Sequence, residues 1–321
     1  MSLLAEAAPS AAPSPVRPPR RPRRTPFLRG PALLLLPAGV VVAALTGWPL
    51  VQLVVMSFQE FGRAQIFGAP PAFVGLDNYV AVLADPQFWA VLSRSVAFCL
   101  VNVALTMALG VGVAVLMTRL GRGMKGLVSI GLLLAWAMPP ISATTVWGWI
   151  FDTRAGLVNH VVTALTPWDL TGHSWLVDPL GFFFVATIIV TWMAVPFVAF
   201  TTFAALTQVP GEVLEAAALD GATGWQRFRL VTVPYVRGVL VVLLILQVIW
   251  DMRVFTQIYA LQTIGGLREE TNTIGVYIYA TATAGGDQGA AGAISVILVV
   301  LMMAVSGYYV VQTLRDEEAR A

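Results

Sequence analysis

The feature that most constrains this chain is a series of long apolar stretches separated by polar segments. A helix needs about 20 apolar residues to cross the hydrocarbon core of a bilayer, and each stretch reaches that length. Helices are favoured because a lipid-exposed backbone must satisfy its hydrogen bonds internally. We therefore predict an all-α, polytopic membrane protein. Its six transmembrane helices are expected at residues 31–57, 91–118, 126–150, 181–206, 237–262 and 289–313.

The composition agrees with a membrane location. Hydrophobic residues make up 58% of the 321 residues and charged residues only 11%. A typical soluble domain has about 25% charged residues. A soluble core of this length could not absorb so much apolar surface. Several tryptophans near the ends of the predicted helices are also typical of membrane interfaces.

Residues that could support catalysis or bind a metal do not form a recognisable site in the sequence. The one cysteine, Cys99, lies in an apolar run, so we expect it to pack there without a disulfide. His160 and His173 lack a spaced set of further ligands and are interpreted as loop residues. There is no GxxxxGK[ST] phosphate loop and no nucleophile–base set. We therefore predict no enzyme activity, cofactor or metal site in this chain, and no nucleic-acid partner.

The N-terminal segment differs from the rest of the chain. It is rich in alanine, proline and serine and then becomes basic, with arginines at Arg17, Arg20, Arg21, Arg23 and Arg24. Such a segment cannot bury a core. We predict a disordered basic cytoplasmic arm at residues 1–29 and one transmembrane domain at 30–321. A proline-rich ligand for a partner domain is an alternative role for the arm. A cleaved signal peptide is not favoured, because the apolar run that follows is too long.

Lysine and arginine are distributed unevenly between the polar segments. Cytoplasmic segments carry an excess of these residues, which sets the orientation of a membrane protein. With the N-terminus inside, the cytoplasmic side holds fourteen of the 19: Arg17, Arg20, Arg21, Arg23, Arg24, Arg29, Arg119, Arg122, Lys125, Arg227, Arg229, Arg237, Arg315 and Arg320. The external segments hold only Arg63, Arg154 and Arg268. We therefore predict cytoplasmic termini and external loops near residues 58–90, 151–180 and 263–288.

The most informative polar segment is Glu215–Pro234, which reads EAAALDGATGWQRFRLVTVP. Just before it, Pro210 suits the first turn of a helix, and the alanine run that follows is strongly helix-forming. Gly221 stands where a left-handed C-terminal cap is expected. Thr223–Gln226 matches a capping box, so a second short helix begins there, and Pro234 marks its expected end. The pattern predicts a helix–turn–helix on the cytoplasmic face.

This pattern resembles the signature loop of the membrane subunits, or permeases, of ABC importers. Eight positions fall where that family has them: Glu215, Ala216, Ala217, Asp220, Gly221, Ala222, Phe228 and Pro234. In that family the loop is the coupling helix, which docks into a cleft on an ATPase subunit. The resemblance implies the type I importer permease fold, with the coupling loop at residues 210–234. It also implies that ATP and magnesium belong to partner ATPase subunits.

The resemblance further implies roles and partners. Glu215 would contact a basic residue of the ATPase, Gly221 would permit the tight turn, and the small side chains of Ala216 and Ala217 would allow close approach. The expected partners are a second homologous permease, two ATPase subunits and an extracellular solute-binding protein. The expected location is the bacterial plasma (inner) membrane, because such a machine moves its solute across the lipid bilayer.

Other segments resemble the carbohydrate-uptake branch of that family, of the maltose, trehalose and glycerol-phosphate type. Val74–Tyr79 and Gly156–Asn159 do so in the predicted external loops. Trp250–Gly266 carries an aromatic residue and an aspartate, then Phe, Ile-Tyr and Gly-Gly in the order of that branch. It departs from the branch at Leu261–Ile264, where Leu-Thr is expected. The resemblance implies that the substrate is a sugar, a di- or oligosaccharide such as trehalose or maltose.

Polar side chains inside transmembrane helices are costly, and they tend to line a path or join helices. Asp251 is the clearest case, about 22 Å along its predicted helix at 1.5 Å per residue. Sugars are bound by hydrogen bonds to hydroxyls and by stacking on aromatic faces, and the resemblance places such contacts on the fourth and fifth helices. The pathway candidates are Thr191, Trp192, Ala194, Phe197, Gln247, Trp250, Asp251 and Asn102. An interhelical hydrogen bond is the alternative role for each polar member.

Two other functions remain open. The same machinery could import a non-sugar solute such as a polyamine or phosphate, although the near-neutral polarity of the predicted helices favours a sugar or polyol. A secondary transporter driven by an ion gradient is the other alternative. It would be expected to carry paired intramembrane carboxylates or a symmetric repeat of broken helices, and the sequence shows neither.

Overall fold

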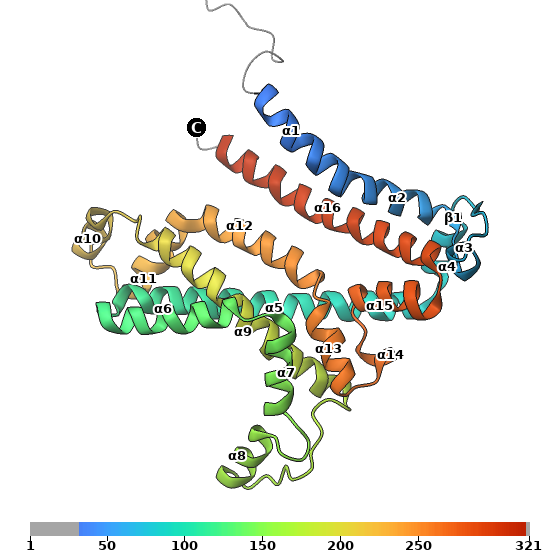
Figure 1. The fold of residues 1–321 in the computed structure, drawn as a ribbon. Helices are drawn as coiled ribbons and strands as arrows, with labels where there is room; N and C mark the ends of the chain where they lie inside the picture. Colours follow the sequence, from blue (N-terminus) through green and yellow to red (C-terminus); the bar gives the residue numbers. More distant parts are fainter. Residues whose placement is uncertain (1–31, 319–321) are drawn as a thin grey trace, which may run out of the picture. The chain divides into compact units, whose positions relative to one another are not determined.

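The computed structural model describes residues 32–318, so the predicted arm at residues 1–29 lies outside the described part of the chain. The described part consists of helices and one small two-stranded sheet (Figure 1). It divides into two compact units, one ending at Val51 and one beginning at Gln52, and each is described by itself.

The described residues of the first unit form an apolar helix. It comprises α1 (Ala32–Val42), the π-helical turn η2 (Ala43–Gly47) and the beginning of α2 (Trp48–Ser57). Nearly all of its described side chains are exposed. An apolar helix with exposed side chains suits a lipid environment. The stretch Leu35–Ser57 is long and apolar enough to cross a membrane, as predicted.

The second unit holds the other elements. The elements before the fourth predicted span are β1 (Gln59–Glu60), α3 (Arg63–Ile66), β2 (Ala72–Phe73), α4 (Asp77–Ala84), α5 (Pro86–Arg119), α6 (Arg122–Ala137), α7 (Pro140–Ile150) and α8 (Leu157–Leu165). Those that follow are α9 (Pro179–Leu206), α10 (Gly211–Leu219), α11 (Gly224–Arg227), η3 (Phe228–Thr232), α12 (Val233–Met252), α13 (Thr256–Ile264), α14 (Arg268–Thr271), α15 (Ile274–Ala280), η4 (Thr281–Gly285) and α16 (Gln288–Glu318).

The number of candidate spans agrees with the predicted fold. By length and composition, five helices in the described residues can cross a membrane, or six if the bent pair α6 and α7 forms one span. Besides the N-terminal helix, they are Pro86–Arg119, Pro179–Leu206, Gly224–Ile264 and Gln288–Gly307. The prediction of an all-α polytopic membrane protein is therefore confirmed.

The third predicted span is broken near its middle. Its two halves, α6 and α7, are bent by 104°. Met138 and Pro139 both adopt extended backbone conformations, with ψ of 129° and 137°. A residue that precedes a proline is disfavoured in the helical region, and here two consecutive residues precede one. Pro140 then begins α7, where its missing N–H costs nothing.

The fifth predicted span, 237–262, lies within the candidate span Gly224–Ile264, but it is not one continuous helix. It comprises α12 and α13, with residues 253–255 between them. The N–H of Arg253 bonds to the carbonyl of Trp250, and the N–H of Val254 bonds to that of Asp251. These bonds span three residues instead of four and tighten the last turn of α12. After this break α13 packs against α7 and α9.

The crossing of α5 and α9 forms the centre of the second unit. A Cβ atom added at Gly110 would lie only 2.6 Å from Cβ of Val198, so glycine is needed for the two helices to approach. The side chains of Phe182 and Ile189 on α9 are fully buried together with Ile258 and Leu261 of α13. A second buried cluster joins α5 to α12, α15 and α16.

The segment Val74–Tyr79 lies between α2 and α5 and is hydrogen-bonded to the end of α2. The side-chain amide of Asn78 donates to the carbonyls of Ser57 and Gln59, both at 2.9 Å. The hydroxyls of Tyr79 and Ser57 are 2.7 Å apart. Gly289, at the start of α16, lies against the same turn, where a side chain would collide with the carbonyl of Gln59. This segment therefore fixes the end of α2 to the beginning of α16.

Candidate functional site

The first half of the predicted loop forms as the sequence indicates. After α10 the N–H of Ala222 bonds to the carbonyl of Ala217 at 3.0 Å, and the N–H of Gly221 bonds to that of Ala218 at 3.1 Å. This pair of bonds is the Schellman arrangement, which needs a left-handed residue. Gly221 supplies it with a φ of +81°, which confirms the predicted C-terminal cap.

The second half begins with the predicted capping box. The backbone N–H of Thr223 donates to Oε1 of Gln226 at 2.7 Å, and the N–H of Gln226 donates to Oγ1 of Thr223 at 3.3 Å. Two N–H groups that the first turn of α11 leaves without a helical partner are thereby satisfied. Local chemistry alone therefore determines both sides of the turn.

The predicted end of the second loop helix at Pro234 is wrong. α11 continues through the π-helical turn η3 into α12, and Pro234 lies in the first turn of α12. A proline inside an α-helix clashes with the carbonyl four residues earlier and removes a hydrogen bond. The wider π turn just before it relieves this conflict. The helix consequently runs without a break from Gly224 to Met252.

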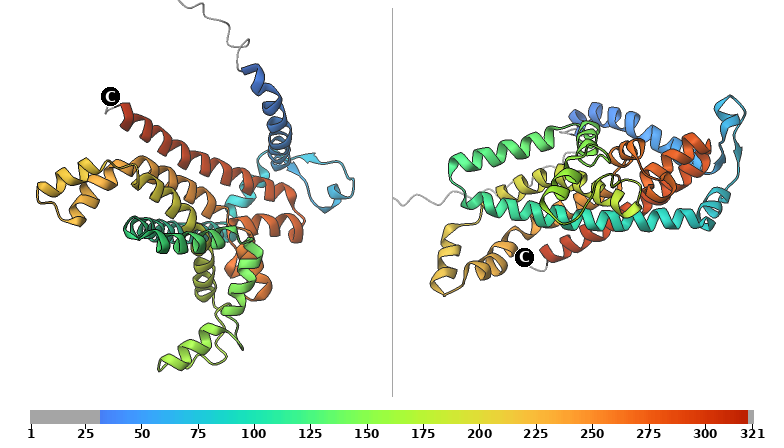
Figure 2. Two further views of the ribbon diagram at one scale, coloured as in Figure 1. Left: turned by 60° about the vertical axis from the view of Figure 1, so that its left-hand side comes forward. Right: turned by 90° about the horizontal axis from the view of Figure 1, so that it is seen from below.

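The loop projects beyond the ends of α5, α9 and α12 (Figures 1 and 2). Among the predicted coupling positions, the exposed ones are Glu215, Ala216, Asp220, Gly221 and Pro234. The half-buried ones are Ala217, Ala222 and Phe228. Leu219 and Trp225 are also exposed, and the Trp225 ring stacks on Phe228 with centroids 5.7 Å apart. Exposed apolar side chains beside acidic ones are typical of a protein-binding surface.

A polar cavity of about 280 Å³ lies among α6, α9, α12 and the turn that leads into α13. We call it the polar cavity. Its polar or charged lining residues are Gln247, Asp251, Arg253, Thr256 and Gln257. Its aromatic lining residues are Trp136, Phe197, Trp250 and Phe255. The rings of Phe197 and Trp250 meet edge to face at 5.0 Å. Hydrogen-bonding groups and aromatic faces therefore converge inside a set of apolar helices.

Asp251 is the most unusual member of the polar cavity. Its side chain is 4% exposed, and Oδ1 accepts a hydrogen bond from Nε2 of Gln247, one turn earlier on α12, at 2.9 Å. Its other oxygen, Oδ2, is buried without a hydrogen-bond partner among the described residues. Leaving such an oxygen unpaired costs free energy. A ligand that donates a hydrogen bond would remove that cost.

Five of the eight predicted pathway residues line the polar cavity: Ala194, Phe197, Gln247, Trp250 and Asp251. Asn102 and Thr191 instead join α5 to α9. The amide of Asn102 donates to the carbonyl of Phe98 at 2.8 Å, and its Oδ1 accepts from the Thr191 hydroxyl at 3.3 Å. Their contact is the interhelical bond that the sequence left open as an alternative. Substrate contact stays a prediction for all eight.

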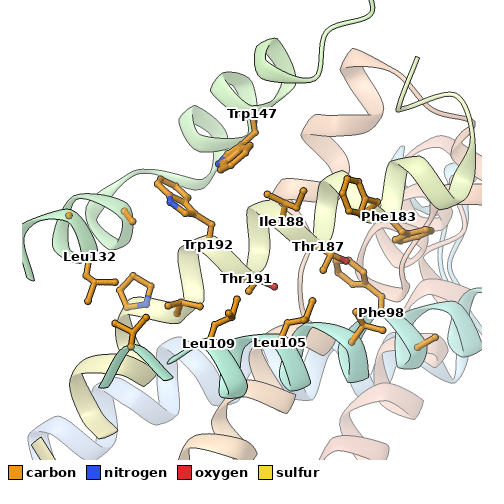
Figure 3. Close-up of a pocket in the computed structure, with 18 of the residues that line it drawn as sticks. Phe98, Leu105, Leu109, Leu132, Trp147, Phe183, Thr187, Ile188, Thr191 and Trp192 are labelled. Atoms are coloured by element: carbon orange, nitrogen blue, oxygen red, sulfur yellow. The ribbon is translucent and has the colours of Figure 1, made fainter. Parts of the chain in front are cut away.

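Trp192, the remaining pathway candidate, lines a second and larger cavity of about 1040 Å³ between α5, α6, α7 and α9, and Thr191 lines it as well. Its indole meets that of Trp147 edge to face at 5.9 Å (Figure 3). The walls are almost entirely apolar, and Arg94 is their only charged side chain. The Arg94 guanidinium is held by the carbonyls of Glu269 and Asn272. These walls can hold apolar groups but offer few partners to a polar ligand.

The polar and aromatic residues of the polar cavity that were not among the pathway candidates are Trp136, Arg253, Phe255, Thr256 and Gln257. Trp136 was covered only by the general interpretation of tryptophans as interfacial residues, and Gln257 lies just beyond the unexpected break between α12 and α13. No local signal marks either one, because each reaches the cavity only through the path of the chain around it.

Outside the candidate spans, Tyr277 and Asp152 have shifted pKa values with clear causes. Burial, followed by the hydrogen bond from its hydroxyl to Asp85, raises the pKa of Tyr277 to about 12. The backbone N–H groups of Ala155 and Arg154, which donate to the Asp152 carboxylate, lower the pKa of Asp152. Both groups hold connecting segments in place, and neither lies in a cavity.

Comparison with known proteins agrees with this geometry. The diacetylchitobiose uptake system permease protein DasB of Streptomyces coelicolor is 41% identical over 288 residues, which cover 90% of this chain and 88% of the relative. The trehalose/maltose transport system permease protein MalF of Thermococcus litoralis is 33% identical over 237 residues, covering 74% and 78%. A bacterial ABC transporter involved in import of the acidic polysaccharide alginate shares the fold. Its TM-score is 0.76 at 20% identity, covering 90% of this chain and 97% of that one.

The family assignment rests on most of the chain. Residues 106–316, which include the loop, the polar cavity and the α5–α9 crossing, match the family described as binding-protein-dependent transport system inner membrane component. The candidate spans independently agree with a multi-pass membrane protein. The chain therefore belongs to the binding-protein-dependent transport system inner membrane components, and it is a permease subunit of that family.

Proposed function

We propose that this permease imports a sugar, a di- or oligosaccharide of the trehalose or maltose type, and that the polar cavity contacts it. The observation that carries the proposal is the buried Asp251 carboxylate, with one oxygen unpartnered, beside the aromatic pair of Phe197 and Trp250. Sugar hydroxyls donate to carboxylate oxygens, and sugar rings pack on aromatic faces. The names of the relatives, which refer to diacetylchitobiose, trehalose and maltose, support the same class.

The size of the polar cavity fits a shared site. Ligand pockets usually measure about 300–1,000 Å³. At about 280 Å³, this cavity holds only part of a disaccharide. The rest of the pathway would come from a second, homologous permease that faces the same cavity. An extracellular binding protein would deliver the sugar to this pair.

The loop is proposed to couple the cavity to ATP hydrolysis by two partner ATPase subunits. Glu215, exposed on α10, would contact a basic residue of one of them. The unbroken helix from Gly224 to Met252 spans about 43 Å at 1.5 Å per residue. It begins in the loop and ends one residue after Asp251, so a push on the loop reaches the cavity through one rigid element. The loop and both termini would then lie in the cytoplasm.

The cavity proposal is tested by Asp251→Asn in the complete complex, reconstituted in vesicles and assayed with labelled sugars. Asparagine keeps the shape of the side chain and an acceptor for Gln247 but removes the charge. A charge-assisted hydrogen bond contributes about 1.5–3 kcal/mol, so KM for uptake should rise by about 10- to 100-fold. Asp169→Asn, in an exposed loop, is the matched control. An unchanged KM would remove Asp251 from the site.

The coupling proposal is tested by Glu215→Lys combined with Gly221→Pro. The pair reverses the charge on the docking surface and prevents the left-handed turn. We expect membrane insertion to persist while uptake is lost and ATP hydrolysis no longer responds to substrate. Glu212→Lys, an exposed glutamate one turn earlier on α10, controls for charge alone. Uptake at the full rate in the double variant would refute the coupling role.

A further inference from the structure

The short helix α8 has its apolar face on the outside. Leu157, Val161 and Leu165 recur at four-residue spacing and therefore share one face. Their side chains are 58%, 40% and 80% exposed. The opposite face carries Asn159, which is buried. A surface helix in a soluble domain has the reverse arrangement, with the apolar stripe turned inward.

The inward face of α8 is fixed by polar contacts. The amide of Asn159 donates to the carbonyl of His173 at 2.9 Å, and its Oδ1 accepts from the indole N–H of Trp175 at 2.6 Å. The hydroxyl of Thr163 accepts from the N–H of Leu170 at 2.9 Å. These bonds prevent rotation of the helix. The apolar stripe therefore faces away from the loop that holds it.

The chain places α8 next to a membrane-crossing element. α7 is half of the bent pair that meets the length and composition of a span. Between α7 and α8 the chain is folded tightly, because the Asp152 carboxylate accepts from the N–H groups of Arg154 and Ala155 and the Asp152 carbonyl accepts from Gly156. α8 lies at the far end of α7 (Figures 1 and 2), and on its inner side Val158 packs against the buried cluster that includes Phe182 of α9.

Lipid fits the stripe better than a protein does. α8 reads LVNHVVTAL and carries no residue of full charge. Nine residues at 1.5 Å each make a face about 14 Å long, hence on the order of 150 Å², whereas a stable protein partner covers about 800 Å². Trp168, three residues beyond the end of α8, is 71% exposed, as is typical of a membrane interface. We propose that α8 lies in the plane of the membrane surface, with Leu157, Val161 and Leu165 inserted among the lipids.

The test uses spin labels on single cysteines in the full transporter complex, in a Cys99→Ser background and phosphatidylcholine nanodiscs. Labels at Val161→Cys and Leu165→Cys report the stripe, and His160→Cys, exposed on the same helix but off the stripe, is the matched control. Oxygen concentrates in lipid and a nickel chelate stays in water. The ratio of oxygen to nickel collision rates should be several-fold higher at the two stripe positions than at His160.

Two outcomes of the spin-label experiment overturn the proposal. Equal ratios at all three positions would place the stripe in water. Stripe labels shielded from both reagents would mean that protein covers them, for example the second permease. An independent measurement compares the parent with Trp168→Phe in lipids with brominated chains. Bromine quenches the fluorescence of a tryptophan that lies among the lipid chains. The part of the emission that Trp168→Phe removes should therefore be quenched in the parent protein. If that part is not quenched, this end of α8 is not inserted.

Discussion

The loop at residues 210–234 and the polar cavity differ in how their shapes are determined. Each feature of the loop depends on residues within five positions of one another, such as the turn at Gly221 and the capping box at Thr223. The polar cavity collects side chains from α6, α9, α12 and α13, which lie far apart in the sequence. Short-range chemistry can therefore be recognised as a motif, whereas a cavity wall exists only after the helices pack.

The two regions are joined by one helix. The sequence predicted a stop at Pro234, which would have made the loop a separate unit. The π turn at Phe228–Thr232 instead allows the helix to continue into the cavity. The exposed loop and a buried carboxylate thus share one continuous helix. A perturbation of either region should leave the local structure of the other intact, and the predictions below test that expectation.

The largest effect is expected at the α5–α9 crossing, which supports the helices around the polar cavity. Gly110→Leu should force α5 and α9 apart, because an added Cβ already meets Val198 at 2.6 Å. Overpacking of this kind costs up to about 3 kcal/mol in unfolding free energy. Thermal unfolding in detergent measures it. Gly112→Leu, where nothing lies within 4 Å, should be close to neutral. If Gly110→Leu and Gly112→Leu lose the same unfolding free energy, the close approach of α5 and α9 is not the cause of the loss.

An intermediate effect is expected on the loop side. Gly221→Val places a branched side chain at a φ of +81°, which costs about 1–2 kcal/mol. We expect faster hydrogen exchange at residues 216–223 and slower uptake, with sugar affinity at the cavity unchanged. Gly224→Ala serves as the control, since nothing lies within 4 Å of the added atom and its φ is not positive. A change in sugar affinity would show that the two regions are not separable.

A smaller effect is expected from the capping box. Thr223→Ala removes the acceptor for the N–H of Gln226 and should destabilise the start of α11 by about 1 kcal/mol. Thr223→Ser keeps the hydroxyl and should retain most of the stability. Hydrogen exchange at the backbone amide of Gln226 measures the difference in stability between the two variants. If the alanine variant exchanges no faster than the serine variant, packing rather than the cap holds this turn.

The smallest effect is expected at the turn before α8, which is determined as locally as the loop. The pKa of Asp152 is lowered by backbone N–H groups, so its contribution to stability is present above the unfolded pKa of about 3.9. It is lost as the pH falls through the lower folded value. A spin label at Arg154→Cys should gain mobility only in that acidic range. Asp152→Asn should abolish the pH dependence, and a transition that survives in this variant must come from another group.

The sequence by itself determined the features that depend on hydropathy and on near neighbours. The long apolar stretches predicted a polytopic helical fold, and Gly221 with Thr223–Gln226 predicted the turn of the coupling loop. The eight-residue motif was also enough to suggest the permease family, which the comparisons show. Each of these signals is contained in one window of the chain, so no packing was needed to read it.

Only the tertiary structure decided which polar groups face a cavity and which join helices. Asn102 and Asp251 are both buried polar residues on apolar helices, yet Asn102 bonds across the α5–α9 crossing, whereas Asp251 lines the polar cavity and has one oxygen without a hydrogen-bond partner among the described residues. The break after Met252 and the continuation through Pro234 depend in the same way on surrounding turns. The physical reason is that the neighbours of a transmembrane helix set the role of its polar side chains, and those neighbours come from distant parts of the sequence.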